Sequence, residues 1–171
     1  LLFSYQTERE PHVRAMIDLA VMMGKVVCVT DPDLALARDK NLIETRRASG
    51  DASGAIPNPK LGTGLLQAKS NIAGELFPQF THKGSRSDDL FGHGAWLIGE
   101  SIGIDGNTLG AAGVSIPSLS YFSPLVSQWL DDKGYNAVLV RPDRVIFGGG
   151  NAAELITAYA DGLYQEARVV A

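Results

Sequence analysis

Residues 138–150 read VLVRPDRVIFGGG, and this stretch says most about the fold of the chain. Two short apolar runs rich in β-branched residues flank four turn-forming residues, which predicts a β-hairpin. Pro142 presets φ at the second turn position and Asp143 suits the third, so we expect a type I turn with Arg141 and Arg144 on either side. Taken alone, the two arginines are expected to be solvated loop charges.

A helix is predicted on each side of this hairpin. Ser123 is a suitable N-cap with Pro124 at the first helical position, and Gly134 is expected to end that helix. Asn151 followed by Glu154 resembles a capping box, which places the start of the second helix. Apolar residues recur at helical spacing in both segments, at Leu125, Val126, Trp129 and Leu130 and at Leu155, Ile156, Tyr159 and Leu163. The order strand, helix, hairpin, helix indicates an α/β fold, a thioredoxin-like mixed sheet with flanking helices.

The glycines at 148–150 stand directly before the second of these helices. A glycine run before a helix N-terminus can bind an anion. The lysine and hydroxyl residue of a phosphate-binding loop are absent, so a strand exit that needs positive φ is the preferred interpretation.

Residues 74–99 hold the side chains that best suit chemistry. Leu76, Phe77 and Phe80 predict one extended segment, and residues 95–98 predict another. His82, Asp88, Asp89 and His93 have metal-ligand side chains, but their spacing matches no zinc or calcium pattern. Ser85 and Ser87 lie near them in sequence, yet no GxSxG elbow is present. The structural interpretation is that Asp88-Asp89-Leu90 caps a short turn before the strand at Ala95.

Residues 100–121 are rich in glycine and weakly patterned. The glycines at 103, 106, 110 and 113 do not form a GxGxxG fingerprint, and no helix is expected to open after them. The sequence therefore predicts a flexible or elaborated loop here.

The N-terminal residues predict two helices. Val13, Met16, Ile17, Ala20 and Val21 recur at helical spacing in the first. We expect Pro11 in its first turn and Gly24 at its end. The second is expected to have Thr30 or Asp31 as N-cap, Pro32 in its first turn and a body that runs to about Arg47. Two helices alone rarely bury enough area to fold, so they must pack either on the rest of this chain or on a further domain.

Glycine, proline, serine and asparagine dominate residues 48–70, which predicts a linker, because a structureless loop longer than about 15 residues is uncommon inside a domain. The expected organisation is a helical segment over 1–50, a linker over 51–73 and a thioredoxin-like domain over 74–171.

Composition narrows the class of protein. The net charge of −4 comes from acidic and basic residues that are mixed along the chain, so nucleic acid is an unexpected partner. No apolar run approaches the roughly 20 residues of a membrane span, and we expect a cytoplasmic location. Cys28 is the single cysteine, which excludes dithiol chemistry within the chain. Its neighbours Val26, Val27 and Val29 predict a buried thiol.

Four segments resemble the C-terminal part of class A FAD-dependent aromatic hydroxylases, the class of 3-(3-hydroxyphenyl)propionate hydroxylase and phenol hydroxylase. The hairpin is similar to their VLVRPDRYV, and residues 2–12, LFSYQTEREPH, to their LLDSYExERRPH helix. PNPKLGTGLL resembles the passage before their last domain, and LFPQ with DDLFGHG resembles the start of that domain. Glu10 stands where the family has a basic residue, and Val145 stands where it has tyrosine.

The resemblance implies that the parent protein is an FAD- and NAD(P)H-dependent monooxygenase that hydroxylates a phenolic ring. It implies that this chain serves packing or dimerisation, with a missing N-terminal flavin-binding domain as partner and a homodimer as a further expectation. No catalytic, cofactor-binding or metal-binding residue is expected in the chain itself. The alternative is a stand-alone thioredoxin-like module without redox chemistry, whose N-terminal helices form a homodimer interface.

Overall fold

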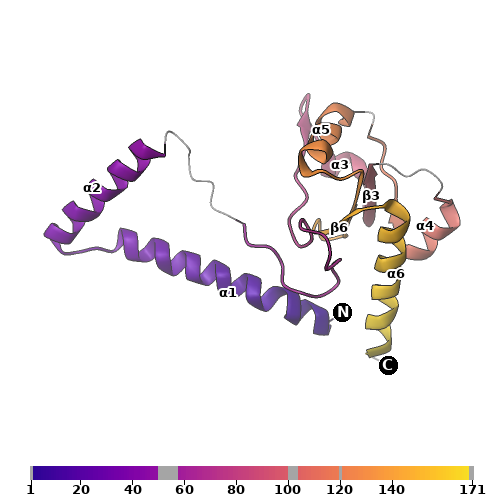
Figure 1. Cartoon of the computed structure of the whole chain (residues 1–171), viewed down its shortest axis with the longest axis horizontal. Helices are drawn as coiled ribbons and strands as arrows, with labels where there is room; N and C mark the ends of the chain where they lie inside the picture. The colour runs from indigo at the N-terminus through magenta and orange to yellow at the C-terminus, as the bar shows by residue number, and fades with distance from the viewer. Residues whose placement is uncertain (1, 50–57, 100–103, 120, 170–171) are drawn as a thin grey trace. The chain divides into compact units, whose positions relative to one another are not determined.

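A computed structural model describes residues 2–49, 58–99, 104–119 and 121–169 (Figure 1). The chain divides into two compact units. The sheet unit comprises Leu1–Arg9 and Lys60–Ala171, and the helix unit comprises Glu10–Pro59. Helix α1 (Leu2–Val27) contributes its first turns to the sheet unit and the rest of its length to the helix unit.

A four-stranded mixed sheet forms the centre of the sheet unit, with strand order β4-β3-β5-β6. Its strands are β3 (Ala95–Gly99), β4 (Val114–Ser115), β5 (Ala137–Val140) and β6 (Ile146–Gly150). β3 is parallel to β4 and antiparallel to β5, and β5 is antiparallel to β6. The predicted hairpin is thus confirmed.

Helices cover both faces of this sheet: α3 (Ser87–Phe91) and α5 (Ser123–Lys133) on one, α4 (Gly106–Ala112) and α6 (Ala152–Val169) on the other (Figure 1). Successive strand residues alternate between the faces, so each strand supplies both cores. The α5 face packs Trp96, Ile98, Val138, Val140 and Ile146 against Phe91, Phe122, Val126 and Leu130. The α6 face packs Ala95, Leu97, Leu139 and Phe147 against Ala112, Leu155, Ile156 and Tyr159. The predicted mixed sheet with flanking helices is confirmed.

The outer edge of β6 is covered by residues 67–77. The backbone N–H of Gln67 donates to Phe147 O at 2.8 Å, and that of Gly74 donates to Ile146 O at 2.9 Å. Leu61 and Ile72 are buried. Residues 60–73, which the sequence predicts as linker, therefore pack on the sheet, whereas residues 50–57 of that segment lie outside the described residues.

Close packing explains most of the glycine run. A Cβ on Gly149 would lie 2.8 Å from the Tyr135 ring, and one on Gly148 would overlap the Gln67 side chain. Of the three glycines in this run, Gly150 alone has a positive φ, at 152°. The predicted strand exit with positive φ therefore holds for Gly150, while the other two glycines make room for neighbours.

The expectation of a loop over residues 100–121 is wrong in its described part, which holds helix α4 and strand β4. The Asp105 carboxylate caps α4 by accepting from the backbone N–H groups of Asn107 and Thr108, both at 2.9 Å. Gly113 ends the helix with φ 63°. The caps at both ends stabilise α4, although its glycine content is unfavourable for a helix.

The ends of α5 and α6 match the sequence closely. α5 has Phe122 in the N-cap position without a side-chain cap, one residue before the predicted Ser123, and Gly134 ends it with φ 73°. Asn151 caps α6 as predicted, by accepting from the N–H groups of Ala153 and Glu154. Leu125, expected on the packed face of α5, is 38% exposed.

Helix α1 is longer than predicted at both ends. Pro11 lies inside it rather than in its first turn, because the helix already begins at Leu2. Gly24 does not end it: the N–H of Cys28 donates to Gly24 O at 2.8 Å and continues the helical pattern. Proline and glycine are start and stop signals by frequency, and a helix held at other positions can continue through them.

Helix α2 (Pro32–Ala48) follows as predicted, with Asp31 rather than Thr30 as its N-cap. Arg38 of α2 donates to Val26 O at 2.8 Å and so ties the helix to the end of α1. None of the described residues of the helix unit is buried. The predicted burial of Cys28 is wrong, because the thiol and its neighbours Val26 and Val27 are exposed. None of the helices in the described ranges is long and apolar enough to cross a membrane.

Candidate functional site

A buried ion pair joins the first turns of α1 to the turn between β5 and β6. Glu8 is 2% exposed, and its carboxylate accepts hydrogen bonds from both terminal nitrogens of the Arg141 guanidinium. The Nη1–Oε1 distance is 2.7 Å and the Nη2–Oε2 distance is 2.9 Å. Parallel bonds of this kind are the strongest arrangement of an arginine and a carboxylate. We call this contact the Glu8–Arg141 joint.

Backbone groups and two further charges complete the joint. The N–H of Leu65 donates to Glu8 Oε1 at 2.7 Å, and Arg141 donates to Leu65 O at 3.2 Å. Asp143 accepts from Arg141 at 3.1 Å and from Arg9 at 3.3 Å. Burial lowers the pKa of Arg141, but the bonds to Glu8 and Asp143 outweigh that effect and raise it. The guanidinium therefore stays charged.

Arg144 is held by a different set of contacts. Its guanidinium carbon lies 3.5 Å from the centre of the Trp96 ring, a cation–π contact. It donates to Gly94 O and to Gly92 O, each at 3.1 Å. Its backbone φ of 67° lies in the left-handed region, which residues other than glycine rarely adopt. These contacts fix the turn against the strand β3.

The expectation that both arginines are solvated is wrong. The reverse turn itself is present, since the N–H of Arg144 donates to Arg141 O at 3.0 Å. However, the Arg141 side chain is 13% exposed and that of Arg144 is 24% exposed. Sequence reasoning missed Glu8 because its partner is 133 residues away. The sequence offers one signal for the pair: two segments that resemble the hydroxylases, residues 2–12 and the hairpin, carry a glutamate and an arginine of opposite charge.

Of the four residues with metal-ligand side chains, His93 is exposed and the other three contact different partners. The His82 ring packs on Tyr121, Asp88 accepts from Gln79 at 2.9 Å, and Asp89 pairs with Arg86 at 3.1 Å. Within the described ranges, no three His, Cys, Asp or Glu side chains gather to hold a metal.

The short turn at Asp88-Asp89-Leu90 is helix α3, and the position before it is Arg86, without a side-chain cap. The two aspartates lie in its first turn, so the predicted capping role is wrong. Ser87 is fully buried, and its hydroxyl accepts from the N–H of Phe80 at 3.0 Å. That contact makes Ser87 part of the fold.

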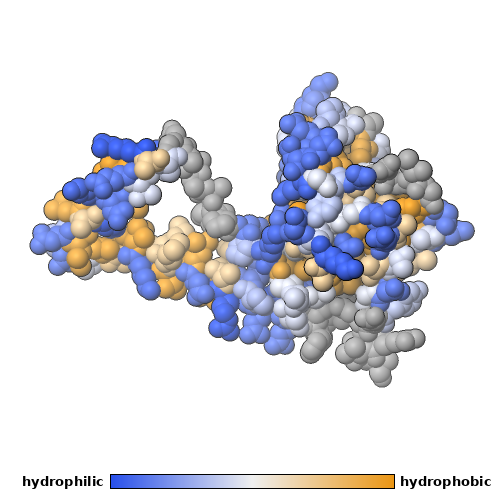
Figure 2. Space-filling model, in the orientation of Figure 1, coloured by the Kyte–Doolittle hydropathy of each residue, from blue (hydrophilic) through white to orange (hydrophobic). Residues whose placement is uncertain are grey.

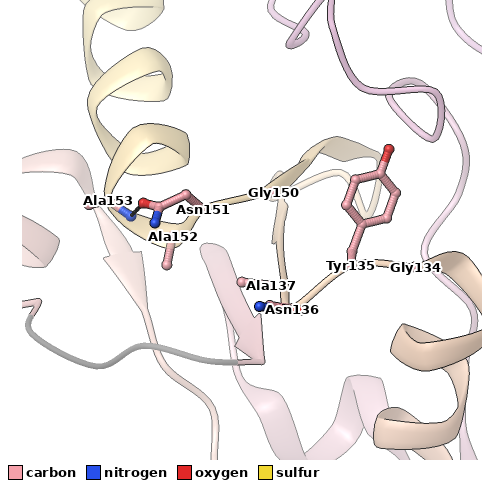
Figure 3. Close-up of a pocket in the computed structure, with 8 residues that line it drawn as sticks. All are labelled: Gly134, Tyr135, Asn136, Ala137, Gly150, Asn151, Ala152 and Ala153. Carbon is pink, nitrogen blue, oxygen red and sulfur yellow. Dashed lines mark hydrogen bonds between the residues drawn. The ribbon is translucent and has the colours of Figure 1, made fainter.

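A hollow of about 520 Å³ lies at the start of α6 (Figure 3). Its walls are Gly134, Tyr135, Asn136, Ala137, Gly150, Asn151, Ala152 and Ala153. The Asn151 side chain turns back to Ala153 of its own helix, and the Tyr135 hydroxyl donates to Asn71 at 2.8 Å. The lining residues include no carboxylate, imidazole, thiol or amine, and their one phenol, Tyr135, is hydrogen-bonded to Asn71.

The sequence of the chain is similar to those of several known proteins. It is 30% identical over 190 residues to a probable NADH-specific resorcinol 4-hydroxylase of Rhodococcus jostii (strain RHA1), a match that covers 94% of the chain and 35% of the relative. The relatives are aromatic hydroxylases. A 3-(3-hydroxy-phenyl)propionate/3-hydroxycinnamic acid hydroxylase of Mycobacterium sp. (strain JLS) is 25% identical over 189 residues, covering 86% of the chain and 33% of that protein. The chain thus spans about a third of the length of the curated relatives it matches and corresponds to their C-terminal region, as the sequence predicts.

A solved structure shares the fold. RebC, soaked with chromopyrrolic acid and holding 7-carboxy-K252c, matches 93% of this chain and 36% of its own, with a TM-score of 0.52 and 19% identity. No protein-family model matches the chain.

Proposed function

We propose that this chain is the C-terminal region of an FAD- and NAD(P)H-dependent monooxygenase that hydroxylates a phenolic ring. The observation that carries the proposal is the match to a probable NADH-specific resorcinol 4-hydroxylase over 94% of the chain. In the proposed reaction one atom of O₂ enters the ring and the other leaves as water, with two electrons from NAD(P)H. We place this activity in the cytoplasm, where the nicotinamide cofactor is supplied.

Within that protein we propose a structural role for this region. Two of the segments that resemble the hydroxylases, residues 2–12 and the hairpin, meet in the Glu8–Arg141 joint, so the resemblance includes both sides of a packing contact. We propose that the chain contributes no catalytic, cofactor-binding or metal-binding residue. The three-part division at residues 50 and 73 stays a prediction about the organisation of the longer polypeptide.

Two features of the described residues support a cofactor site elsewhere in the polypeptide. The side chains of Gln67 and Tyr135 occupy the space beside the backbone of Gly148 and Gly149, so a pyrophosphate has no room there. The residues that line the hollow beside α6 include no lysine or arginine and no serine or threonine, the side chains that a phosphate-binding loop uses. We therefore assign both nucleotide cofactors to the part of the polypeptide that the relatives carry outside the matched region.

The test compares two purified proteins, the 171-residue chain and the polypeptide encoded by its complete reading frame. We expect the longer protein to be yellow, to oxidise NADH or NADPH in the presence of a phenol, and to yield a product heavier by one oxygen atom in mass spectrometry. The 171-residue chain should be colourless and inactive. A longer protein without bound flavin or hydroxylated product would contradict the monooxygenase, and stoichiometric flavin on the short chain would contradict the structural role.

A further inference from the structure

Helix α1 carries an apolar stripe that no described residue of its own unit buries. Its members recur three or four positions apart and therefore share one face of the helix. They are Val13, Met16, Ile17, Ala20, Met23 and Val27. Ile17 is 57% exposed and Val27 is 76% exposed. Hydrophobic side chains gather over α1 and α2 in the space-filling view (Figure 2).

The exposure goes beyond scattered surface residues. None of the described residues of the helix unit is buried, so these helices have no core of their own. A soluble protein rarely leaves a contiguous apolar surface of this kind without a partner. Isolated helices also gain little stability in water, because most helical stability in proteins comes from packing of the apolar face.

Gly24 is a second observation on the same helix. It lies within α1, where glycine costs about 1 kcal/mol relative to alanine. A Cβ at this position would meet nothing within 4 Å, so the described structure gives no reason for a glycine. Gly24 follows Ala20 by four positions and falls on the edge of the stripe. Two small residues there leave space for a surface that approaches the helix closely.

We infer that this stripe docks onto the part of the polypeptide that precedes the matched region in the relatives. The argument for this occupant is length: the chain spans 35% of the relative of Rhodococcus jostii, so most of that protein lies outside the match. The occupant is an apolar surface of the same polypeptide, and the inference rests on the proposed function. The Glu8–Arg141 joint fixes the first turns of the same helix to the sheet unit. Helix α1 thereby links two parts of one protein.

Amide hydrogen exchange on the full reading frame and on the 171-residue chain tests this docking. We expect the amides of residues 13–27 to exchange at least about a hundredfold more slowly in the longer protein, because a packed helix opens rarely. Met16→Glu with Ile17→Glu should abolish that protection by placing two charges in an apolar contact. Arg14→Glu places the same charge on the polar side of α1 and should preserve it. Gly24→Leu should speed exchange at least about tenfold in the longer protein, since its side chain fills the space left for the partner.

Protection of α1 that survives the double variant would overturn the inference, as would equal exchange in the two proteins. A reading frame that adds no segment before Leu1 would also overturn it, because the proposed occupant would not exist. Protection in the 171-residue chain that rises with protein concentration would instead identify a second copy as the occupant. In the 171-residue chain, far-ultraviolet circular dichroism shows whether each variant keeps its helices, and the fluorescence of Trp96 and Trp129 shows whether the sheet unit stays folded. A flavin-containing, active hydroxylase with an unprotected α1 would refute the docking alone, whereas a protected α1 in a protein without flavin would refute the monooxygenase alone.

Discussion

The two units of the chain use similar apolar residues with opposite results. In the sheet unit Ile98 is fully buried between a strand and a helix, whereas Ile17 of the helix unit is 57% exposed. The sheet unit has two apolar faces and helices that cover both, so the hydrophobic side chains on both faces of the sheet are packed. The helix unit presents apolar faces that no described residue of that unit buries. Hydrophobic patterning predicts a helix in both cases, but only a matching surface turns it into a core.

Helix α1 contains this contrast within a few turns. Glu8, a charged residue, is buried because Arg141 and Leu65 satisfy its carboxylate. Ile17, an apolar residue, lies exposed nine positions later. The position of a side chain therefore follows from the partner that the fold brings to it rather than from its polarity alone.

Arg141→Met should give the largest effect, because it leaves the Glu8 carboxylate buried without its partner. Breaking a buried ion pair by removing one member costs about 3–5 kcal/mol. The measurement is urea unfolding of the sheet unit, followed by the fluorescence of Trp96 and Trp129.

The matched control for this variant is the double replacement Glu8→Leu with Arg141→Met. It removes both charges, so most of the lost free energy of unfolding should return. A loss below about 1 kcal/mol for Arg141→Met alone would show that α1 is not anchored through this contact.

A pair of isoleucine-to-alanine variants tests the contrast between the units directly. Ile98→Ala should lower the free energy of unfolding by about 2–5 kcal/mol, because it opens a cavity in the α5 face of the sheet. Ile17→Ala should change it by about 0.5 kcal/mol or less, as for other exposed positions. Urea titrations followed by far-ultraviolet circular dichroism, which reports on the helices of both units, measure both variants. Similar losses for the two variants would mean that α1 is packed in the isolated chain.

Two glycine-to-alanine variants should change stability in opposite directions. Gly149→Ala should cost about 1–3 kcal/mol, because its Cβ would lie 2.8 Å from the Tyr135 ring. Gly24→Ala should add up to about 1 kcal/mol of helix stability, since open space surrounds it and alanine is the better helix former. Urea unfolding measures the first and far-ultraviolet circular dichroism the second. A loss of helix content in Gly24→Ala would show that this glycine is needed for the conformation of α1.

Local signals predicted the parts of the fold that local contacts determine. The hairpin, the Asp31 and Asn151 caps and the end of α5 at Gly134 all depend on residues a few positions apart. The sequence pattern does not predict helix α4, because its glycine content favours a loop. Asp105 and Gly113, which cap the two ends of the helix, are the signals that favour it. The ends of α1 do not follow from Pro11 and Gly24, because contacts elsewhere hold the helix and it continues through both residues.

The joint could not be predicted from local pattern, because its two charges are 133 residues apart. Neither charge is distinctive alone: a glutamate on a helix and an arginine in a turn are both usually solvated. Cys28 shows the reverse error. Its valine neighbours suggested burial, but burial depends on a covering surface, which the described helix unit does not contain. Neither the pairing of residues far apart in the sequence nor the presence of a covering surface can be predicted from local sequence patterns.

Acid should have a small effect, through an ion-paired carboxylate at the surface of the sheet unit. Glu75 lies 2.9 Å from Lys60 and 3.0 Å from Lys133. Burial raises the pKa of Glu75, but the hydrogen bonds and charges of the two lysines outweigh it and lower the pKa below the ordinary value of 4.5. A carboxylate with a lowered folded-state pKa stabilises the fold above the unfolded pKa, and that contribution is lost as the pH falls through the folded value. Stability from Glu75 should therefore be constant above about pH 4.5 and decline below it.

Glu75→Gln should lower the free energy of unfolding by about 1 kcal/mol or less at pH 7, as expected for a partly exposed pair, and should make the decline below pH 4.5 shallower. Urea titrations between neutral and acid pH, read by tryptophan fluorescence, measure both effects. Asp39→Asn removes a comparable ion pair with Arg38 in the helix unit and should leave the same curves unchanged, because both tryptophans lie in the sheet unit. If Asp39→Asn also changed the acid limb, unfolding of the helix unit would be coupled to that of the sheet. In that case the two units would not differ in stability as their burial implies.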